Sequence, residues 1–309
     1  MLTATHHLLV PDPPHYAWDN SLRPRLTIAS GDTVTFETHD ASDGHFRLDS
    51  TSADVASYEF RGHPLTGPVY VERAQPGDVL QVEVLEVRPA SFGWTAILPD
   101  FGLLPEDFSS VYLRTWNLSD GAYARLGDRF RIPLAPFCGV MGVAVAEPGE
   151  HPTMPPRRTG GNVDIKHLVA GSTLYLPIEV DGALFSIGDA HAAQGDGEVC
   201  VSAIEMSSTT TVRLQVRPDM SLQEPQFQTP GVPLASGPAY VTTAHGPDLM
   251  QSTKQAIRYM IEHLVQAYGL SREDAYCLCS VAVDLKISEV VDAPNWIVSA
   301  FLPLEIVRD

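Results

Sequence analysis

Short runs of alternating or β-branched residues recur along the first two thirds of the chain, and several follow a glycine or proline turn signal. Turn signals stand at 30–32, 76–78 and 127–128, and the runs cover 33–38, 79–87, 129–134, 172–180, 183–189 and 209–216. Runs of this length between turns are typical of antiparallel strands in a β-sandwich. The apolar period shifts once within 79–87, which predicts an irregular strand there.

The pattern changes after about residue 246. Apolar residues recur at spacings of three and four from Leu249 to Tyr268, which predicts an amphipathic helix that ends at Gly269. Ser271 and Asp274 resemble the start of a second helix, and 295–307 returns to β character.

These patterns together predict a β-rich α+β fold with β-sandwich-like sheets and a C-terminal α+β portion. We expect a β-rich main body over 1–245, which includes the polar loops described below, and an α+β portion over 246–309 packed on it.

Composition excludes several classes of protein. Hydrophobic residues make up 44% of the 309 residues, yet no apolar run approaches the roughly 18 residues of a membrane span. The first twenty residues lack the pattern of a secretory signal, so we expect a cytoplasmic protein without a membrane partner. The formal net charge of −18 would repel phosphate backbones, so nucleic acid is not an expected partner.

Two polar, glycine-rich segments, 160–168 and 188–205, interrupt the strand pattern. Glycines let the backbone turn sharply there and approach a ligand closely. A turn at Asp181-Gly182 predicts a β-hairpin that would bring the two segments together. Their polar side chains are Asn162, Asp164, Asp189, His191, Gln194, Asp196, Glu198 and Glu205.

The pair Asp189 and His191 carries the metal hypothesis. Residues two apart in extended backbone point to one side, so this pair could present a carboxylate oxygen and an imidazole nitrogen to one divalent ion. The alternative is an aspartate bonded to a loop amide beside a histidine that only packs. Candidates for a further ligand are Asp164, Glu198, His45 and His63.

Several segments of the chain together resemble the acetamidase/formamidase family. The resemblance runs in order from about Val34 to Pro303, and its most specific segments are 63–87, 93–108, 160–200, 203–205 and 275–303. It implies hydrolysis of formamide, acetamide or similar short amides to a carboxylate and ammonia, by a cytoplasmic homodimer or higher homo-oligomer that uses a divalent metal such as zinc. This chain departs from the family pattern at Thr159, where histidine is expected, and at Val163, where methionine is common.

A metal-activated water is the favoured route to amide hydrolysis, because it supplies both a nucleophile and a polarised carbonyl. Within this hypothesis Glu198 and Asp164 are the catalytic candidates, while Asn162, Gln194 and Glu205 would bind the substrate. The metal candidates are Asp189, His191, His45 and His63.

Two alternatives stay open. A cysteine-dependent amidase would use Cys138 or Cys200, although buried cysteine usually serves only as a small hydrophobe. A non-catalytic member of the same family would bind a small molecule and leave it unchanged. A serine nucleophile is not expected, because the 160–205 region has no GxSxG elbow.

Overall fold

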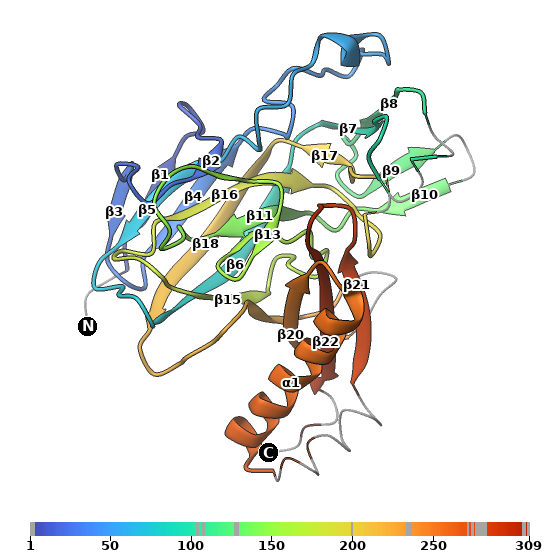
Figure 1. Cartoon of the computed structure of the whole chain (residues 1–309). Helices are drawn as coiled ribbons and strands as arrows, with labels where there is room; N and C mark the ends of the chain where they lie inside the picture. The colour runs from blue at the N-terminus through green and yellow to red at the C-terminus, as the bar shows by residue number, and fades with distance from the viewer. Residues whose placement is uncertain are drawn as a thin grey trace.

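The computed structural model describes residues 4–102, 105–106, 109–126, 130–198, 200–232, 237–270, 272, 275, 283–304 and 307. Within these residues, two nine-stranded sheets form the body of the molecule (Figure 1). The first sheet has the order β1 (His6–Leu9), β4 (Thr33–Thr38), β18 (Ser208–Arg217), β6 (Val79–Pro89), β15 (Thr173–Pro177), β19 (Gln226–Thr229), β20 (Ala239–Gly246), β22 (Trp296–Pro303) and β21 (Asp284–Glu289).

The second sheet holds most of the residues that build the site described below. Its order is β13 (Pro156–Arg157), β14 (Gly160–Asn162), β11 (Phe137–Gly142), β16 (Phe185–His191), β17 (Glu205–Met206), β7 (Phe92–Ile97) and β8 (Tyr112–Asn117). In addition, β5 (Thr66–Val71) pairs with β16, and β3 (Leu26–Ile28) pairs with β5. Smaller elements are β9 (Tyr123–Leu126) with β10 (Phe130–Pro133), β2 (Ala17–Trp18) with β12 (His151–Pro152), and the 3-10 turn η1 (Asp54–Ser57).

The main core lies between the two sheets. Phe36 on β4 and Phe185 on β16 meet edge to face, with ring centroids 5.8 Å apart. Buried apolar residues of both sheets belong to one continuous cluster, as expected for two sheets packed face to face. The sandwich-like architecture predicted from the strand pattern is therefore confirmed.

Strand β6 contains the predicted irregularity. It pairs with β18 so that Glu86 faces Thr211 and Val84 faces Val212, which leaves Leu85 without an opposite residue. The side chain of Leu85 is 41% exposed, whereas Val84 and Val87 are buried. The shift in hydrophobic period thus marks a β-bulge.

The C-terminal helix α1 (Leu249–Tyr268) has the bounds that the sequence predicts. The side chain of Asp248 accepts a hydrogen bond from the Gln251 N–H at its start, and Gly269 ends it with φ 68°. The helix packs on β20 and β22, and these strands with β21 and α1 extend from one end of the body (Figure 1).

The second helix predicted from Ser271 and Asp274 begins outside the described residues. Within the described part of the chain, no helix combines the length and apolar character that a membrane crossing requires.

The predicted hairpin at Asp181-Gly182 is wrong. Strand β15 belongs to the first sheet and β16 to the second, so the turn carries the chain between sheets and does not pair its two flanking strands. The two polar segments still meet, because β14 and β16 are both neighbours of β11. The division of the chain at residue 245 stays a prediction, and that position lies within β20.

Candidate active site

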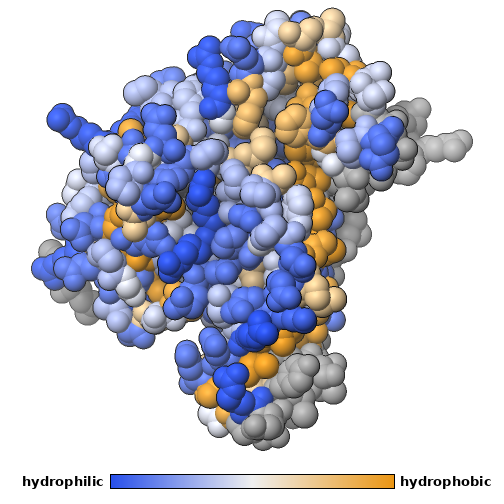
Figure 2. All heavy atoms as spheres, in the orientation of Figure 1, coloured by the Kyte–Doolittle hydropathy of each residue, from blue (hydrophilic) through white to orange (hydrophobic). Residues whose placement is uncertain are grey.

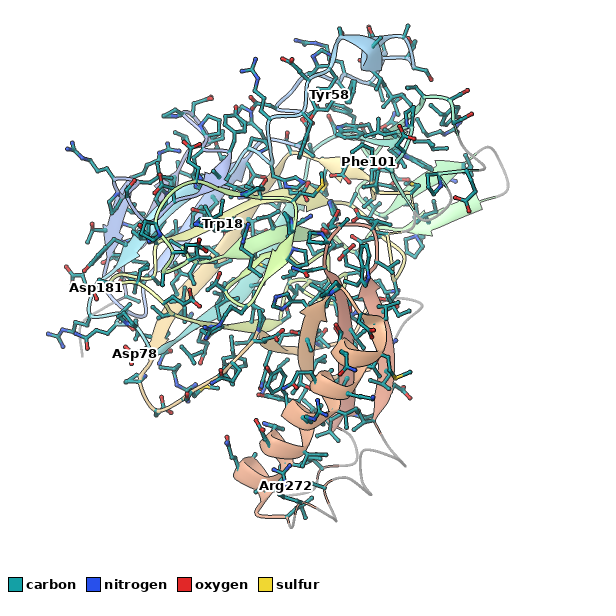
Figure 3. The ribbon with its side chains drawn as sticks, in the orientation of Figure 1. Trp18, Tyr58, Asp78, Phe101, Asp181 and Arg272 are labelled. Carbon is teal, nitrogen blue, oxygen red and sulfur yellow. The ribbon has the colours of Figure 1, made fainter. Side chains whose placement is uncertain are left out.

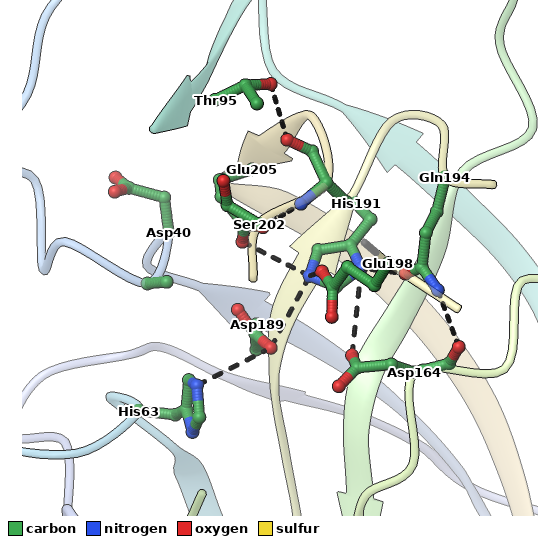
Figure 4. Close-up of polar contacts among 12 residues, drawn as sticks. Asp40, His63, Thr95, Asp164, Asp189, His191, Gln194, Glu198, Ser202 and Glu205 are labelled. Carbon is green, nitrogen blue, oxygen red and sulfur yellow. Dashed lines mark hydrogen bonds and ion pairs between the residues drawn. The ribbon is translucent and has the colours of Figure 1, made fainter. Parts of the chain in front are cut away.

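Four carboxylates surround one histidine at the end of the second sheet (Figure 4). Strand β16 contributes Asp189 and His191, the adjoining β17 contributes Glu205, and Asp164 follows β14. Glu198 comes from the loop between β16 and β17. All five side chains are buried, although carboxylates are rarely buried without a counter-charge.

The imidazole of His191 lies at the centre of this group. Its Nε2 is 3.1 Å from Oε2 of Glu205, 3.4 Å from Oδ2 of Asp189 and 3.9 Å from Oε1 of Glu198. Its Nδ1 is 3.8 Å from Oδ1 of Asp164. The expected meeting of Asp189 with His191 is therefore present, and the two polar segments contribute to one site.

Gln194 fixes which nitrogen of His191 faces the carboxylates. Its Oε1 is 2.9 Å from Nδ1 of His191, while its Nε2 donates to the backbone carbonyl of Asp164 at 2.7 Å. Because the amide nitrogen is used as a donor there, Oε1 must be the acceptor towards the ring. Nδ1 of His191 therefore carries a proton, and Nε2, whose own proton a metal ion would replace, is the nitrogen that could bind a metal.

Several buried atoms of this group have no hydrogen-bond partner among the described residues: Nε2 of His191, Oε2 of Glu205, Oδ1 of Asp189 and Oδ1 of Asp164. Glu205 is held in place because its other oxygen, Oε1, accepts the Ala203 N–H at 2.7 Å. Buried atoms of this kind without a partner point to a missing counter-ion or ligand.

Two triads offer ligand atoms within 4.8 Å of one another: Asp189, His191 and Glu205, and Asp164, His191 and Glu198. The first is the better candidate, because its carboxylates approach Nε2 of His191 and Gln194 already occupies Nδ1. One imidazole and two carboxylates suit zinc, and three protein ligands leave one position open.

The pKa shifts of these side chains show that the site favours a positive charge. Burial raises the pKa of Glu205 to about 7, and burial also raises the pKa values of Glu198 and Asp164 well above their usual range. Burial would raise the pKa of Asp189 too, but the charges of His63 and His191 hold it below its usual range. Burial would lower the pKa of His191, yet Glu205 and Asp189 raise it well above normal. A cation here would stabilise carboxylates that burial otherwise penalises.

The two further histidine candidates lie in different places. His63 is buried, with its Nε2 3.8 Å from Oδ2 of Asp189, and its Nδ1 lies 3.0 Å from the hydroxyl of Thr153. His45 is exposed, and its Nε2 contacts the carbonyl of Asp54 at 3.2 Å. Contact with η1 holds the His45 ring there, so the structure does not bring His45 to the carboxylates.

A carboxylate near the C-terminus reaches the same site, and sequence reasoning missed it. Asn162 Nδ2 donates to Asp292 Oδ2 at 2.5 Å and to the Met154 carbonyl at 3.1 Å. Asp292 lies between β21 and β22, where Glu289 accepts its backbone N–H at 2.5 Å. The turn signal at Ala293-Pro294 is the sequence feature that marks this segment, and it does not indicate what lies nearby.

Gly139 on β11 is a second residue that the sequence analysis did not select. A Cβ atom at this position would collide with Oδ1 of Asp164 and would lie 2.8 Å from Cε1 of His191. The space between Asp164 and His191 therefore depends on glycine at this strand position. The sequence pointed instead to its neighbour Cys138, because cysteine is a possible nucleophile.

The cysteine candidates have other surroundings. Cys138 is buried in the core between the sheets, where its Sγ lies 3.4 Å from the Thr210 hydroxyl. Burial raises the pKa of its thiol to about 11. Cys200 is half-buried and donates to the Ser202 carbonyl at 3.3 Å. Cys277 and Cys279 lie outside the described residues.

A cavity of about 350 Å³ opens beside this group. Its polar end is lined by His63, Asn162, Asp164, Asp189, Glu198, Glu205 and Asp292. The carboxylate of Glu198 accepts no backbone N–H among the described residues, so it is available to a ligand in the cavity. Thr159, the site of departure from the family pattern, is buried and is not among the lining residues described.

Comparison with known proteins identifies the family of the chain. The model of the acetamidase/formamidase family matches residues 6–151 and 144–309. A putative formamidase of Schizosaccharomyces pombe is 27% identical and a formamidase of Methylophilus methylotrophus is 28% identical, each over 94% of this chain and 89% of the relative. The crystal structure of an acetamidase from Bacillus halodurans superposes with a TM-score of 0.88 and 32% identity, over 96% of this chain and 97% of that one. The chain therefore belongs to the acetamidase/formamidase family.

Proposed function

We propose that the protein hydrolyses the C–N bond of linear amides, such as formamide, acetamide or similar short amides, to a carboxylate and ammonia. The observation that carries the proposal is the carboxylate of Glu198. It is buried and lines the cavity, and its Oε1 lies 3.9 Å from Nε2 of His191. Relatives named formamidase and acetamidase along almost the whole chain support the same reaction.

The residues of the cavity have different roles in the hydrolysis. Glu198 accepts a proton as the oxygen of a water molecule forms a bond to the amide carbonyl carbon. Glu198 then returns that proton to the amide nitrogen, the C–N bond breaks, and ammonia leaves a carboxylic acid that ionises. Burial raises the pKa of Glu198 well above its usual range, which makes its carboxylate a stronger base than that of a free glutamate. Asp164 and Asn162 line the polar end, where the unpaired Oδ1 atoms of both residues would accept hydrogen bonds from the NH2 group of the amide.

Asp189, His191 and Glu205 would hold a divalent metal, and their ligand types suit zinc. When bound, such an ion polarises the carbonyl group and lowers the pKa of water towards about 7. Glu205, expected from the sequence to contact substrate, is then a ligand candidate. Gln194 positions His191 through Nδ1, and His63 approaches the carboxylate of Asp189.

A cysteine route is less favoured. Cys138 does not line the cavity in the described residues, and a thiol of pKa about 11 carries almost no thiolate at neutral pH. Cys200 does not line this cavity but a neighbouring one, which shares Glu198 and Ser202 with it.

Ammonia release from a panel of amides, measured with and without a chelator, tests the proposal. We expect turnover of at least one linear amide, loss of activity on chelation, and about one divalent ion per chain by elemental analysis. A folded protein that releases no ammonia from any amide would instead be a non-catalytic binding member. Metal-free, chelator-insensitive turnover would overturn the metal assignment and leave the amidase proposal in place.

A further inference from the structure

The cavity beside His191 has two unlike ends. The carboxylates described above form its polar end, and aliphatic and aromatic side chains, most of them in one hydrophobic cluster, form the apolar end. Six of the residues at this apolar end are Val55, Tyr58, Trp94, Leu98, Phe101 and Val111. Figure 2 shows hydrophobic residues in a band that begins at the end of the molecule carrying η1 and passes β7.

The aromatic walls offer no polar group to a ligand. The indole N–H of Trp94 donates to Oδ1 of Asp40 at 2.9 Å, and the hydroxyl of Tyr58 donates to the Ala41 carbonyl at 2.8 Å. Both polar tips are therefore satisfied by the protein, and the rings present apolar surface to the cavity. The ring of Phe46, 4.9 Å from Trp94 and 5.3 Å from Tyr58, fixes this wall.

The cavity is also large for the smallest amides. Acetamide has four heavy atoms, which fill roughly 120 Å³ if each takes about the volume of a liquid water. The cavity measures about 350 Å³, so acetamide at the polar end would leave most of the apolar end without a ligand. Phe101, 45% exposed, lies at the same end of the molecule as Tyr58 (Figure 3), so the apolar end is accessible from solvent.

We propose that the preferred substrates are linear amides with an apolar chain of about four to six carbons, whose amide group lies at the carboxylates and whose chain lies against Tyr58 and Trp94. This inference rests on the amide hydrolysis proposed above and names its substrate class. The walls exclude polar chains of equal length, because hydroxyl groups there would lose hydrogen bonds to water without replacement.

The test compares kcat/KM for acetamide, butyramide and hexanamide, with gluconamide as a hydroxylated control of the same chain length as hexanamide. We expect kcat/KM to rise at least roughly 10-fold from acetamide to hexanamide and to be low for gluconamide. A maximum at formamide or acetamide, or equal values for hexanamide and gluconamide, would overturn the inference.

Two variants locate the effect in the cavity. Leu98→Trp and Val111→Phe place extra atoms at the apolar end, so the ratio of kcat/KM for hexanamide to that for acetamide should fall at least about 10-fold in each. Leu8→Trp, on an exposed position of β1 outside the cavity lining, is the control and should keep the wild-type ratio. An unchanged ratio in both cavity variants would contradict the assignment of this wall.

A binding measurement distinguishes failure of the proposed amide hydrolysis from failure of the inference about the substrate chain. If no amide is turned over, the thermal midpoint of the wild-type protein still reports binding, since a ligand of the native state raises it. A larger rise with hexanamide than with acetamide at equal concentration supports the apolar substrate class. An equal or smaller rise contradicts it.

Discussion

Gln194 decides the role of His191, because its Oε1 accepts a hydrogen bond from Nδ1–H and so turns Nε2 towards Asp189 and Glu205. We expect Asp189→Ala and His191→Ala to lose turnover and bound metal while the chain stays folded. Gln194→Ala should lose only about 10- to 100-fold in activity or metal affinity, since it removes an orienting partner and no ligand. Gln228→Ala, an exposed glutamine on β19, is the matched control.

Elemental analysis, ammonia release and circular dichroism of these four variants would check that Asp189→Ala and His191→Ala lose more activity and metal than Gln194→Ala. Near wild-type rates in both Asp189→Ala and His191→Ala would place the active site elsewhere.

The cysteines are expected to be dispensable for catalysis. Cys138→Ala should retain kcat, because the Cys138 thiol lies in the core between the sheets and stays protonated at neutral pH. Loss of a buried sulfur should lower the free energy of unfolding by about 1 kcal/mol. Cys200→Ala should keep both activity and stability. Denaturant unfolding and ammonia release separate these effects, and a folded Cys138→Ala protein without turnover would favour the cysteine mechanism.

At the scale of elements, strand β11 leaves room for Asp164 and His191 because position 139 is a glycine. In Gly139→Ala the new methyl group would collide with Asp164 and crowd His191, so activity and metal binding should fall at least about 10-fold. The control is Gly237→Ala, where a Cβ meets no atom within 4 Å and the backbone needs no left-handed conformation. If Gly139→Ala keeps full activity, the spacing of Asp164 and His191 is not critical.

Local signals predicted single elements well. The bounds of α1 follow from the spacing of three and four and from Gly269, which lie within one segment. The bulge at Leu85 follows from one shift in the apolar period. The hairpin at Asp181-Gly182 was wrong because the sequence marks a turn and not the sheet that each flanking strand joins, which long-range packing decides.

The same limit applies to the site. The two polar segments were recognisable because Asp164, Asp189 and His191 lie in glycine-rich sequence that does not resemble a strand. Asp292 was not recognisable as a site residue, since about 130 residues of chain separate it from its partner Asn162. His45 and His63 looked alike as turn histidines, and only tertiary structure places one beside Asp189 and the other against η1.

At the scale of the molecule, the C-terminal part both completes the sheet and supplies a carboxylate to the site. The first sheet runs from β1 to β21, so it joins the two ends of the chain. Helix α1 covers β20 and β22 with a second core that includes Met260, Leu264 and Val298. The chain's own sheet therefore covers most of the apolar face of α1.

The assembly of the protein is a further prediction. The edge strand β21 exposes Leu285 and Ile287, which are 48% and 44% accessible, and edge strands commonly pair or pack across a two-fold axis. We expect a homodimer or a higher homo-oligomer. Light scattering at micromolar concentration should give at least twice 33.6 kDa, and Leu285→Lys with Ile287→Lys should weaken an assembly built on this edge. A mass that stays at 33.6 kDa would rule the oligomer out.

The proposed function depends on one carboxylate that faces the cavity, that of Glu198. The most direct measurement is the initial rate of ammonia release by Glu198→Gln, on the amide that the wild-type protein hydrolyses fastest, beside Glu150→Gln as an exposed control. Because glutamine keeps the shape but cannot carry a proton between water and the amide nitrogen, we predict that kcat falls by about 10²- to 10⁴-fold with an unchanged melting temperature. Ammonia release by Glu198→Gln at the rate of the control would contradict the account.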